Sequence, residues 1–237
     1  MLRCIRLDCS QTTANYRKPM SVQVAESYRL PPYSTVIGMV HNLCGFTEYH
    51  PLRISVQGEY QTIIGDMYTR YFFGTTYDAT RHQCYTENED GKKDGITRGL
   101  GTNELLVDLK LVLHILPEEK DYQAVLAGLK KPAIYPSLGR YEDLMRIDKL
   151  AEVELEPTDS PDLEYDAYVP ESLFSKSEGD IVCPRYLLNK VYRVDPKRGC
   201  REWERVAAFY IAKGSELIFD EQIAYREKGG KTGVFLA

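Results

Sequence analysis

The sequence lacks the features that mark membrane-spanning, zinc-binding and secreted proteins. It contains no apolar run close to the ~18 residues that cross a bilayer as a helix. Its six cysteines form no C-x-x-C pair, and its four histidines add no zinc-binding spacing. The first residues, MLRCIRLDC, alternate in polarity and indicate a strand rather than a signal peptide. These absences predict a cytoplasmic protein with reduced thiols, no metal and no other cofactor.

An excess of positive charge is missing as well. The formal net charge is −5, so a nucleic-acid-binding surface would have to be local. No internal repeat or low-complexity tract is present, and a hydrophobic content of 43% is typical of a folded globular chain. Tyrosine, by contrast, is abundant, with 18 residues. Tyrosine rings pack in protein cores, but they also stack on unpaired bases.

One stretch, YRLPPYSTVIGMVHNLCG from Tyr28 to Gly45, predicts a helix with a prepared start. Two prolines hold the incoming chain extended, and Ser34 or Thr35 can cap the first turn. Apolar residues then recur at helical spacing, and Gly45 suits the left-handed residue that ends a helix. The stretch is either an ordinary core helix or one whose start, with Arg29 nearby, binds a phosphate.

The remaining patterns complete a β-α-β-β-α-β order over residues 1–156. Residues 2–9, 52–57, 104–116 and 144–156 alternate as strands, and residues 118–130 carry a helical stripe. The strand that begins at residue 52 can run on to Phe73, because the residues that follow it favour strands. We therefore predict an α+β fold with a ferredoxin-like or RRM-like unit. The strand of residues 2–9 should pair antiparallel with that of 104–116, and both helices should cover one face.

Two segments fall outside this unit. Residues 74–103 lose apolar periodicity and predict an inserted loop or hairpin that turns near Asp90-Gly91. The second segment is residues 157–237, and the proline-containing acidic stretch of residues 152–180 that leads into it is either a solvated linker or an interaction surface. Eight bases against three acids follow between residues 185 and 213. We predict a small, mostly β domain there.

Two motifs resemble the CRISPR-associated Cas-five family of the RAMP superfamily, and most of all its type I-B members. They are LPPYSTVIGMVHNLCG and YPSLGRYEDLMRID. The resemblance implies a non-catalytic subunit of a type I Cascade effector complex. Such a subunit grips the 5′ handle of the CRISPR RNA, caps the filament of Cas-seven backbone subunits and touches the large subunit. Residues 74–103 would be a thumb that reaches the backbone.

Holding single-stranded RNA requires cations, amides and aromatic platforms. Together with the resemblance, this requirement selects ten candidates. The cations are Arg17, Lys18, Arg29, Arg140 and Arg146; the helix-start residues are Ser34 and Thr35; the platforms are Tyr16, Tyr33 and Tyr141. The glycine-rich loop common before the last strand in RAMP proteins is reduced here to Gly139.

Two alternatives remain open from the sequence. Type I-C members cut precursor RNA without metal, through tyrosine, lysine and histidine, but this chain has no Lys-His pair. Its histidines at positions 41, 82 and 114 are the residues on which an endoribonuclease would have to rely. The other alternative is an assembly subunit that contacts only proteins.

Overall fold

The computed structural model describes residues 2–21, 23–174, 183–219 and 223–237, so residues 175–182 of the predicted acidic linker lie outside the described chain. The elements in chain order are β1 (Leu2–Ala14), β2 (Val24–Ala25), α1 (Tyr33–Cys44), β3 (Leu52–Glu59), β4 (Thr62–Thr76), β5 (Cys84–Glu87), β6 (Lys93–Pro117), α2 (Tyr122–Lys130), β7 (Arg146–Thr158), β8 (Asp166–Pro170), a 3₁₀ turn (Glu171–Leu173), β9 (Arg185–Val194), β10 (Arg201–Ile211), β11 (Ala224–Glu227) and β12 (Gly233–Val234). The predicted α+β class is confirmed.

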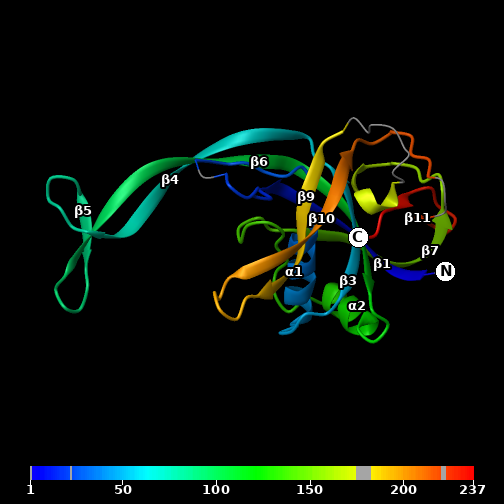
Figure 1. Ribbon diagram of the computed structural model, residues 1–237, viewed down its shortest axis with the longest axis horizontal. Helices are drawn as coiled ribbons and strands as arrows, with labels where there is room; N and C mark the ends of the chain where they lie inside the picture. Colours follow the sequence, from blue (N-terminus) through cyan, green and yellow to red (C-terminus); the bar gives the residue numbers. More distant parts are fainter. Residues whose placement is uncertain (1, 22, 175–182, 220–222) are drawn as a thin grey trace.

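The strands join in one sheet. Along its main path the described strands follow the order β12-β11-β7-β1-β6-β3-β8-β10-β9 (Figure 1). β1 is antiparallel to both β6 and β7, and β6 is antiparallel to β3. The predicted pairing of residues 2–9 with 104–116 is confirmed, with Ile5 opposite Ile115 and Cys9 opposite Leu111.

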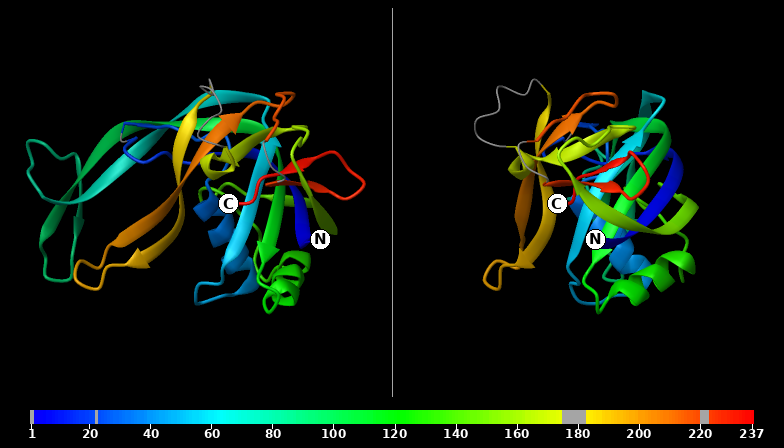
Figure 2. Two further views of the ribbon diagram at one scale, coloured as in Figure 1. Left: turned by 45° about the vertical axis from the view of Figure 1, so that its right-hand side comes forward. Right: turned by 90° about the vertical axis from the view of Figure 1, so that its right-hand side faces the viewer.

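Both helices lie on one face of the central strands (Figure 2). α1 buries Val36, Ile37, Val40 and Leu43 in the main core, as its helical spacing predicts. It ends at Gly45, whose φ of 69° is the left-handed conformation expected there. α2 begins at Tyr122, four residues after the predicted start, because Pro117 still belongs to β6. The other face is partly covered by the end of the chain, where Val234 and Leu236 pack with Cys4 and Leu155.

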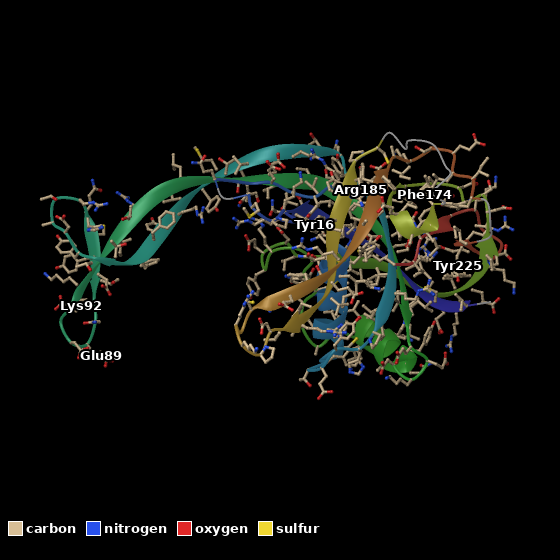
Figure 3. The ribbon with its side chains drawn as sticks, viewed as in Figure 1. Tyr16, Glu89, Lys92, Phe174, Arg185 and Tyr225 are labelled. Atoms are coloured by element: carbon tan, nitrogen blue, oxygen red, sulfur yellow. The ribbon has the colours of Figure 1, made fainter. Side chains whose placement is uncertain are left out.

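β4, β5 and most of the first half of β6 form a hairpin that extends far from the body of the molecule (Figures 1 and 3). Its arms pair from Thr62 opposite Val107 to Thr76 opposite Asp94. The predicted turn at Asp90-Gly91 is present, closed by a bond from the Asn88 amide to the Lys92 carbonyl. The hairpin begins before residue 74, the predicted start of the insertion. In the sequence, Met67 and its apolar neighbours up to Phe73 are typical of a buried strand, but on this arm they are exposed.

The strands after residue 157 extend the same sheet at both edges. β11 pairs with β7, and β8 pairs with β3 and then continues to β10 and β9. Part of the acidic stretch lies in β7, where Glu152, Glu154 and Glu156 occupy alternate positions. They pair with Arg3, Lys228 and Arg226 respectively. These three acids are therefore neutralised within the fold.

No helix in the described part of the chain is long and apolar enough to cross a membrane.

Candidate nucleic-acid interface

The end of β1 fixes a loop of residues 137–144, which contains the SLGR sequence. The buried Gln11 side-chain amide donates to the carbonyls of Leu138 and Asp143, at 2.8 and 2.9 Å. The Tyr16 hydroxyl in turn donates to the Gln11 side-chain oxygen. Because one side chain binds both limbs of the loop, the loop is held in a defined position against β1.

Asp143 is the centre of this loop. Its buried carboxylate accepts from the backbone amides of Asn15 and Arg140, at 3.0 and 2.8 Å. It also accepts from the Arg140 guanidinium, with an Nη2–Oδ1 distance of 2.6 Å. This carboxylate holds the pKa of Arg140 above its usual value through the hydrogen bond.

Gly139 is required by this close packing. Its φ is +110°, a conformation that side chains disfavour. A Cβ atom there would lie 2.9 Å from an Asp143 carboxylate oxygen and 3.1 Å from the Asn15 carbonyl oxygen. Glycine is therefore required at this position, because a residue without a Cβ atom lets the loop pack closely against Asn15 and Asp143.

A groove lies between this loop and the exposed side of α1. It has a volume of about 360 Å³ and is lined by Ser34, Thr35 and Gly38 of the helix, by Ser137 and Gly139 of the loop, and by Trp203 of β10. Gly38 has no atom within 4 Å of the position its Cβ would take, so backbone is accessible along the helix.

A second, separate cavity, of about 340 Å³, is lined by the next loop residue, Arg140. It brings together Arg17 and Arg140 with Asp66 and Glu142 at the base of the long hairpin. Two guanidinium groups face two carboxylates, so this cavity carries no clear excess of positive charge. Arg140 is bound by Asp143 and by Glu142 at 2.9 Å, whereas Arg17 donates to the Ser21 carbonyl.

Two predicted aromatic platforms are core residues. Tyr16 is 2% exposed and Tyr33 is fully buried, so neither presents a ring face to a ligand. Burial raises the pKa of both hydroxyls. The prediction was wrong because an aromatic ring next to arginine, lysine or serine in sequence can still point into the core. Tyr141, by contrast, is 93% exposed on the 137–144 loop.

The predicted phosphate site at the start of α1 is also wrong. Pro32 is the N-cap residue, and neither Ser34 nor Thr35 caps the helix. The Thr35 amide already donates to the Pro32 carbonyl at 2.9 Å. Residues 30–33 are all buried, so this helix end is closed to an anion. Ser34 and Thr35 instead line the groove with their helix.

The remaining predicted cations are dispersed. Lys18 pairs with Glu26 at 3.3 Å, and Arg146 pairs with Asp148 at 2.6 Å beside a different cavity. Arg29 is half-buried and lines neither the groove nor the cavity beside Arg140. The structure therefore groups Arg17 with Arg140, and Ser34 with Thr35, but it does not gather all ten candidates.

His41 and His50 are engaged in local structure. His41 Nδ1 lies 2.9 Å from the Ile37 carbonyl, and its Nε2 accepts from the His50 amide at 2.9 Å. Burial lowers the pKa of His41. His50 Nδ1 lies 3.0 Å from the Asp121 carboxylate.

His82 and His114 are also engaged. The His82 ring is nearly buried and its Nδ1 accepts from the Asp78 amide at 3.0 Å. His114 is fully buried and its Nε2 lies 2.9 Å from the Glu227 carboxylate. All four histidines of the chain thus have structural contacts. Among the residues described, no cluster of three or more His, Cys, Asp or Glu could hold a metal ion.

Comparison with known proteins identifies the family. The family model described as CRISPR-associated protein (Cas_Cas5) matches residues 4–198, which is more than half of the chain. The chain belongs to this Cas_Cas5 family. No curated protein matches the sequence significantly.

One solved structure shares the fold of this chain, and two others are less similar. A chain titled "CRISPR RNA-guided surveillance complex" has a TM-score of 0.55 and 14% identity, with 91% of each chain covered. A "Crystal structure of Cas protein" has a TM-score of 0.45 and 13% identity, covering 92% of this chain and 96% of the other. A CRISPR protein from Archaeoglobus fulgidus has a TM-score of 0.45 and 10% identity, with both chains covered fully.

In this Cas_Cas5 chain the two motifs that resemble the family meet in space. The first motif supplies α1, including Ser34 and Thr35, and the second supplies the 137–144 loop, including Ser137 and Gly139. All four residues line the groove. Neighbours in that groove are thus about a hundred residues apart in the chain.

Sequence reasoning missed the residues that build this groove. Gln11 and Asn15 orient the loop through hydrogen bonds to residues more than 120 positions away. No local sequence pattern predicts hydrogen bonds over such a separation. Trp203 and its basic neighbours on β9 and β10 were assigned only to a β-rich domain. The signal available for them was the excess of bases from Arg185 to Lys213, together with the chain's single tryptophan.

Proposed function

We propose that this Cas_Cas5 chain is a non-catalytic subunit of a type I CRISPR effector complex that holds the 5′ handle of the CRISPR RNA. The observation that carries the proposal is the meeting of the two family motifs in one groove, between α1 and the 137–144 loop. The type I-B subtype is part of the proposal and rests on the resemblance alone.

The groove suits a single strand. The hydroxyls of Ser34, Thr35 and Ser137 lie along it, and Tyr141, on the same loop as Ser137, has an exposed ring. Arg17 and Arg140 line a separate cavity beside the same loop, together with Asp66 and Glu142. Amides, hydroxyls and cations bind phosphates, and exposed rings stack on unpaired bases, so these groups match the needs of an RNA handle.

The fold supports an RNA-binding unit of the ferredoxin-like type. The central strands follow the order β7-β1-β6-β3, with α1 between β1 and β3 and α2 between β6 and β7 in the chain. We propose that residues 1–156 form this RRM-like unit and that residues 157–237 are a β-rich addition to it. Such a subunit would act in the cytoplasm, where CRISPR RNA is.

We further propose that the long hairpin contacts the Cas-seven backbone filament, and that the body touches the large subunit. Several large apolar side chains on the arms are strongly exposed, among them Met67 at 68%, Phe73 at 66% and Leu100 at 74%. Apolar side chains gathered on a projecting hairpin are typical of a protein interface.

The contacts of the histidines favour binding without cutting. A general base needs a ring nitrogen that can reach the 2′-hydroxyl of the RNA. His82 and His114 are buried, and both ring nitrogens of His41 face backbone groups of the protein. None of the three histidines on which the endoribonuclease alternative relies, at positions 41, 82 and 114, is therefore placed for that role.

The test is co-expression with the neighbouring CRISPR-associated gene products, followed by purification and sequencing of any RNA that comes along. We expect recovery of CRISPR RNA with an intact 5′ handle. Separately, the isolated chain should bind a short single-stranded repeat RNA less tightly as salt rises. An assembly subunit that contacts only proteins would show no such binding, and an endoribonuclease would cut the repeat RNA in EDTA.

A further inference from the structure

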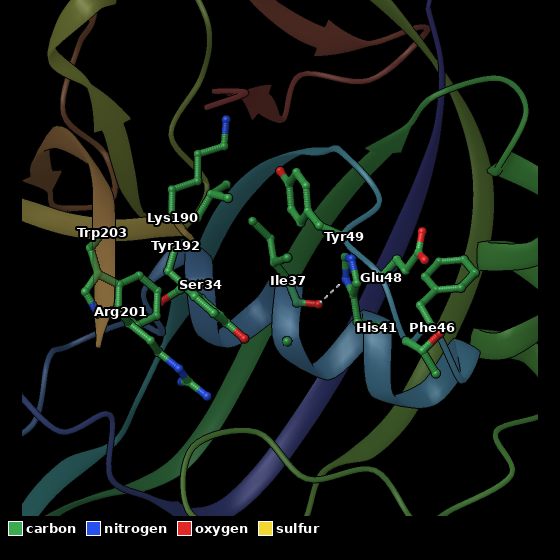
Figure 4. Close-up of a pocket in the computed structure, with 13 residues that line it drawn as sticks. Ser34, Ile37, His41, Phe46, Glu48, Tyr49, Lys190, Tyr192, Arg201 and Trp203 are labelled. Carbon is green, nitrogen blue, oxygen red and sulfur yellow. Dashed lines mark hydrogen bonds between the residues drawn. The ribbon is translucent and has the colours of Figure 1, made fainter. Parts of the chain in front are cut away.

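A larger cavity adjoins the groove on the other side of Trp203. It has a volume of about 450 Å³ and lies between α1 and the two-stranded β9–β10 hairpin (Figure 4). Ser34, Gly38 and Trp203 line both spaces, so the groove and the cavity are continuous. A cavity of this size is within the range that holds small molecules or single nucleotides.

Aromatic rings stand on two sides of the cavity. On the hairpin, Trp203 is directly opposite Tyr192 across the strands, with ring centroids 5.2 Å apart. On the helix side, the half-exposed ring of Tyr49 stacks on His41 at 5.7 Å and 8°. Rings held in this way are ready to stack on a flat ligand, because little side-chain freedom is lost on binding.

The cavity is also lined by two cations, Lys190 and Arg201. Lys190 and Arg201 form no ion pair with any residue in the described ranges, although Arg201 lies 4.4 Å from the centre of the Tyr192 ring. Burial lowers the pKa of Lys190, and the carboxylate of Glu204 only partly opposes that effect. Glu48, which is exposed, is the one carboxylate among the residues that line the cavity.

Some other cations of the described chain are held by ion pairs. Arg140, Arg146 and Arg185 are each bound by a carboxylate within 3 Å. A half-buried lysine next to aromatic rings, without such a partner, is costly unless an anion binds there. The combination of stacking surfaces with two available cations is the arrangement that a nucleotide requires.

We propose that this cavity holds one unstacked nucleotide of the bound RNA, with its base against Trp203 and its phosphate at Lys190 and Arg201. The inference rests on the proposed function and adds a base-binding subsite whose tryptophan and two cations, on β9 and β10, lie outside both family motifs.

The chain provides its own reporter, because Trp203 is its only tryptophan. The experiment titrates the full chain with fluorescein-labelled (rA)₁₂ and (rU)₁₂ and follows both probe anisotropy and tryptophan emission. We expect emission to be quenched over the same concentration range in which anisotropy rises. Trp203→Ala should weaken RNA binding about 10-fold, the loss typical of one stacked base, and Trp203→Phe should retain most of the affinity.

Charge variants test the phosphate contact. Lys190→Gln should make the salt dependence shallower by about one phosphate contact. The matched control is Arg198→Gln on the same hairpin, whose side chain is 77% exposed and points to Asp195; it should change neither affinity nor quenching. If Trp203→Ala does not fold, quenching of the unmodified chain and the Lys190→Gln slope decide the matter.

The outcomes separate the two proposals. Anisotropy that rises without quenching, with Trp203→Ala binding as tightly as the unmodified chain, refutes the base-binding cavity and leaves the RNA-binding function standing. A complete lack of RNA binding refutes both. Equal quenching by polyglutamate would assign the cavity to an acidic protein segment and also refute the nucleotide.

Discussion

Replacing Asp143 with alanine should loosen the loop that forms one wall of the groove. The buried carboxylate accepts two backbone amides and the Arg140 guanidinium. Each lost amide bond is worth about 1 kcal/mol, and the charge-assisted bond about 1.5–3 kcal/mol. Because Arg140 remains 25% exposed and keeps Glu142 as a partner, its charge is not stranded. The expected loss is therefore about 3.5 kcal/mol, near the low end for breaking a buried ion pair.

Urea denaturation of the purified chain measures this loss, with the free energy of unfolding compared at an unchanged slope. The matched control is Glu142→Ala, which removes the other carboxylate bound to Arg140. Since the Glu142 side chain is 62% exposed, that change should cost less than about 1 kcal/mol. A cost for Asp143→Ala equal to that of Glu142→Ala would refute the role assigned to the buried carboxylate.

Three further predictions concern RNA, assembly and pH. Arg17→Ala should weaken binding of a short single-stranded RNA by about 1 kcal/mol, measured by anisotropy, and should make the salt dependence of that binding shallower by about one phosphate contact. Unchanged binding would remove Arg17 from the interface. Phe73 is exposed, so Phe73→Asp should shift the free energy of unfolding by no more than about 0.5 kcal/mol. The same change should reduce co-purification with the backbone subunit, and normal assembly would contradict the hairpin's proposed role. Burial lowers the pKa of His41 in the folded state, so the unfolded chain binds more protons at this residue than the folded chain does as the pH falls below about 6.5. The contribution of His41 to the free energy of unfolding is therefore fully present above that pH and is lost as the pH drops below it. His41→Gln should flatten that part of a pH–stability curve measured by denaturation, and an unchanged curve would count against this.

The central strands and both helices could be predicted because their residues alternate or recur with one burial preference. The strand of residues 104–116 and the helical stripe of α1 are examples, and both are buried as expected. The long hairpin was predicted only in part, because its exposed arms carry apolar residues such as Met67 and Phe73. In an isolated sequence those residues look the same as a buried strand.

Pairing between distant segments could not be predicted. No local pattern shows that β8 joins β3 while β11 joins β7 at the opposite edge. The same holds for the interface, where residues far apart in the chain are fixed by Gln11, Asn15 and Asp143. The burial of a single tyrosine also cannot be predicted from its sequence neighbours. Tyr16 and Tyr141 are both next to an arginine, but only Tyr141 is exposed to solvent.

The most direct test of the central claim is equilibrium binding of a 5′-labelled single-stranded repeat RNA to the purified chain in EDTA, with the RNA sized afterwards. The account predicts saturable binding that weakens steadily as salt rises, and RNA recovered at full length. RNA that fails to bind at low salt, or that is recovered as defined fragments, would contradict a subunit that holds the handle without cutting it.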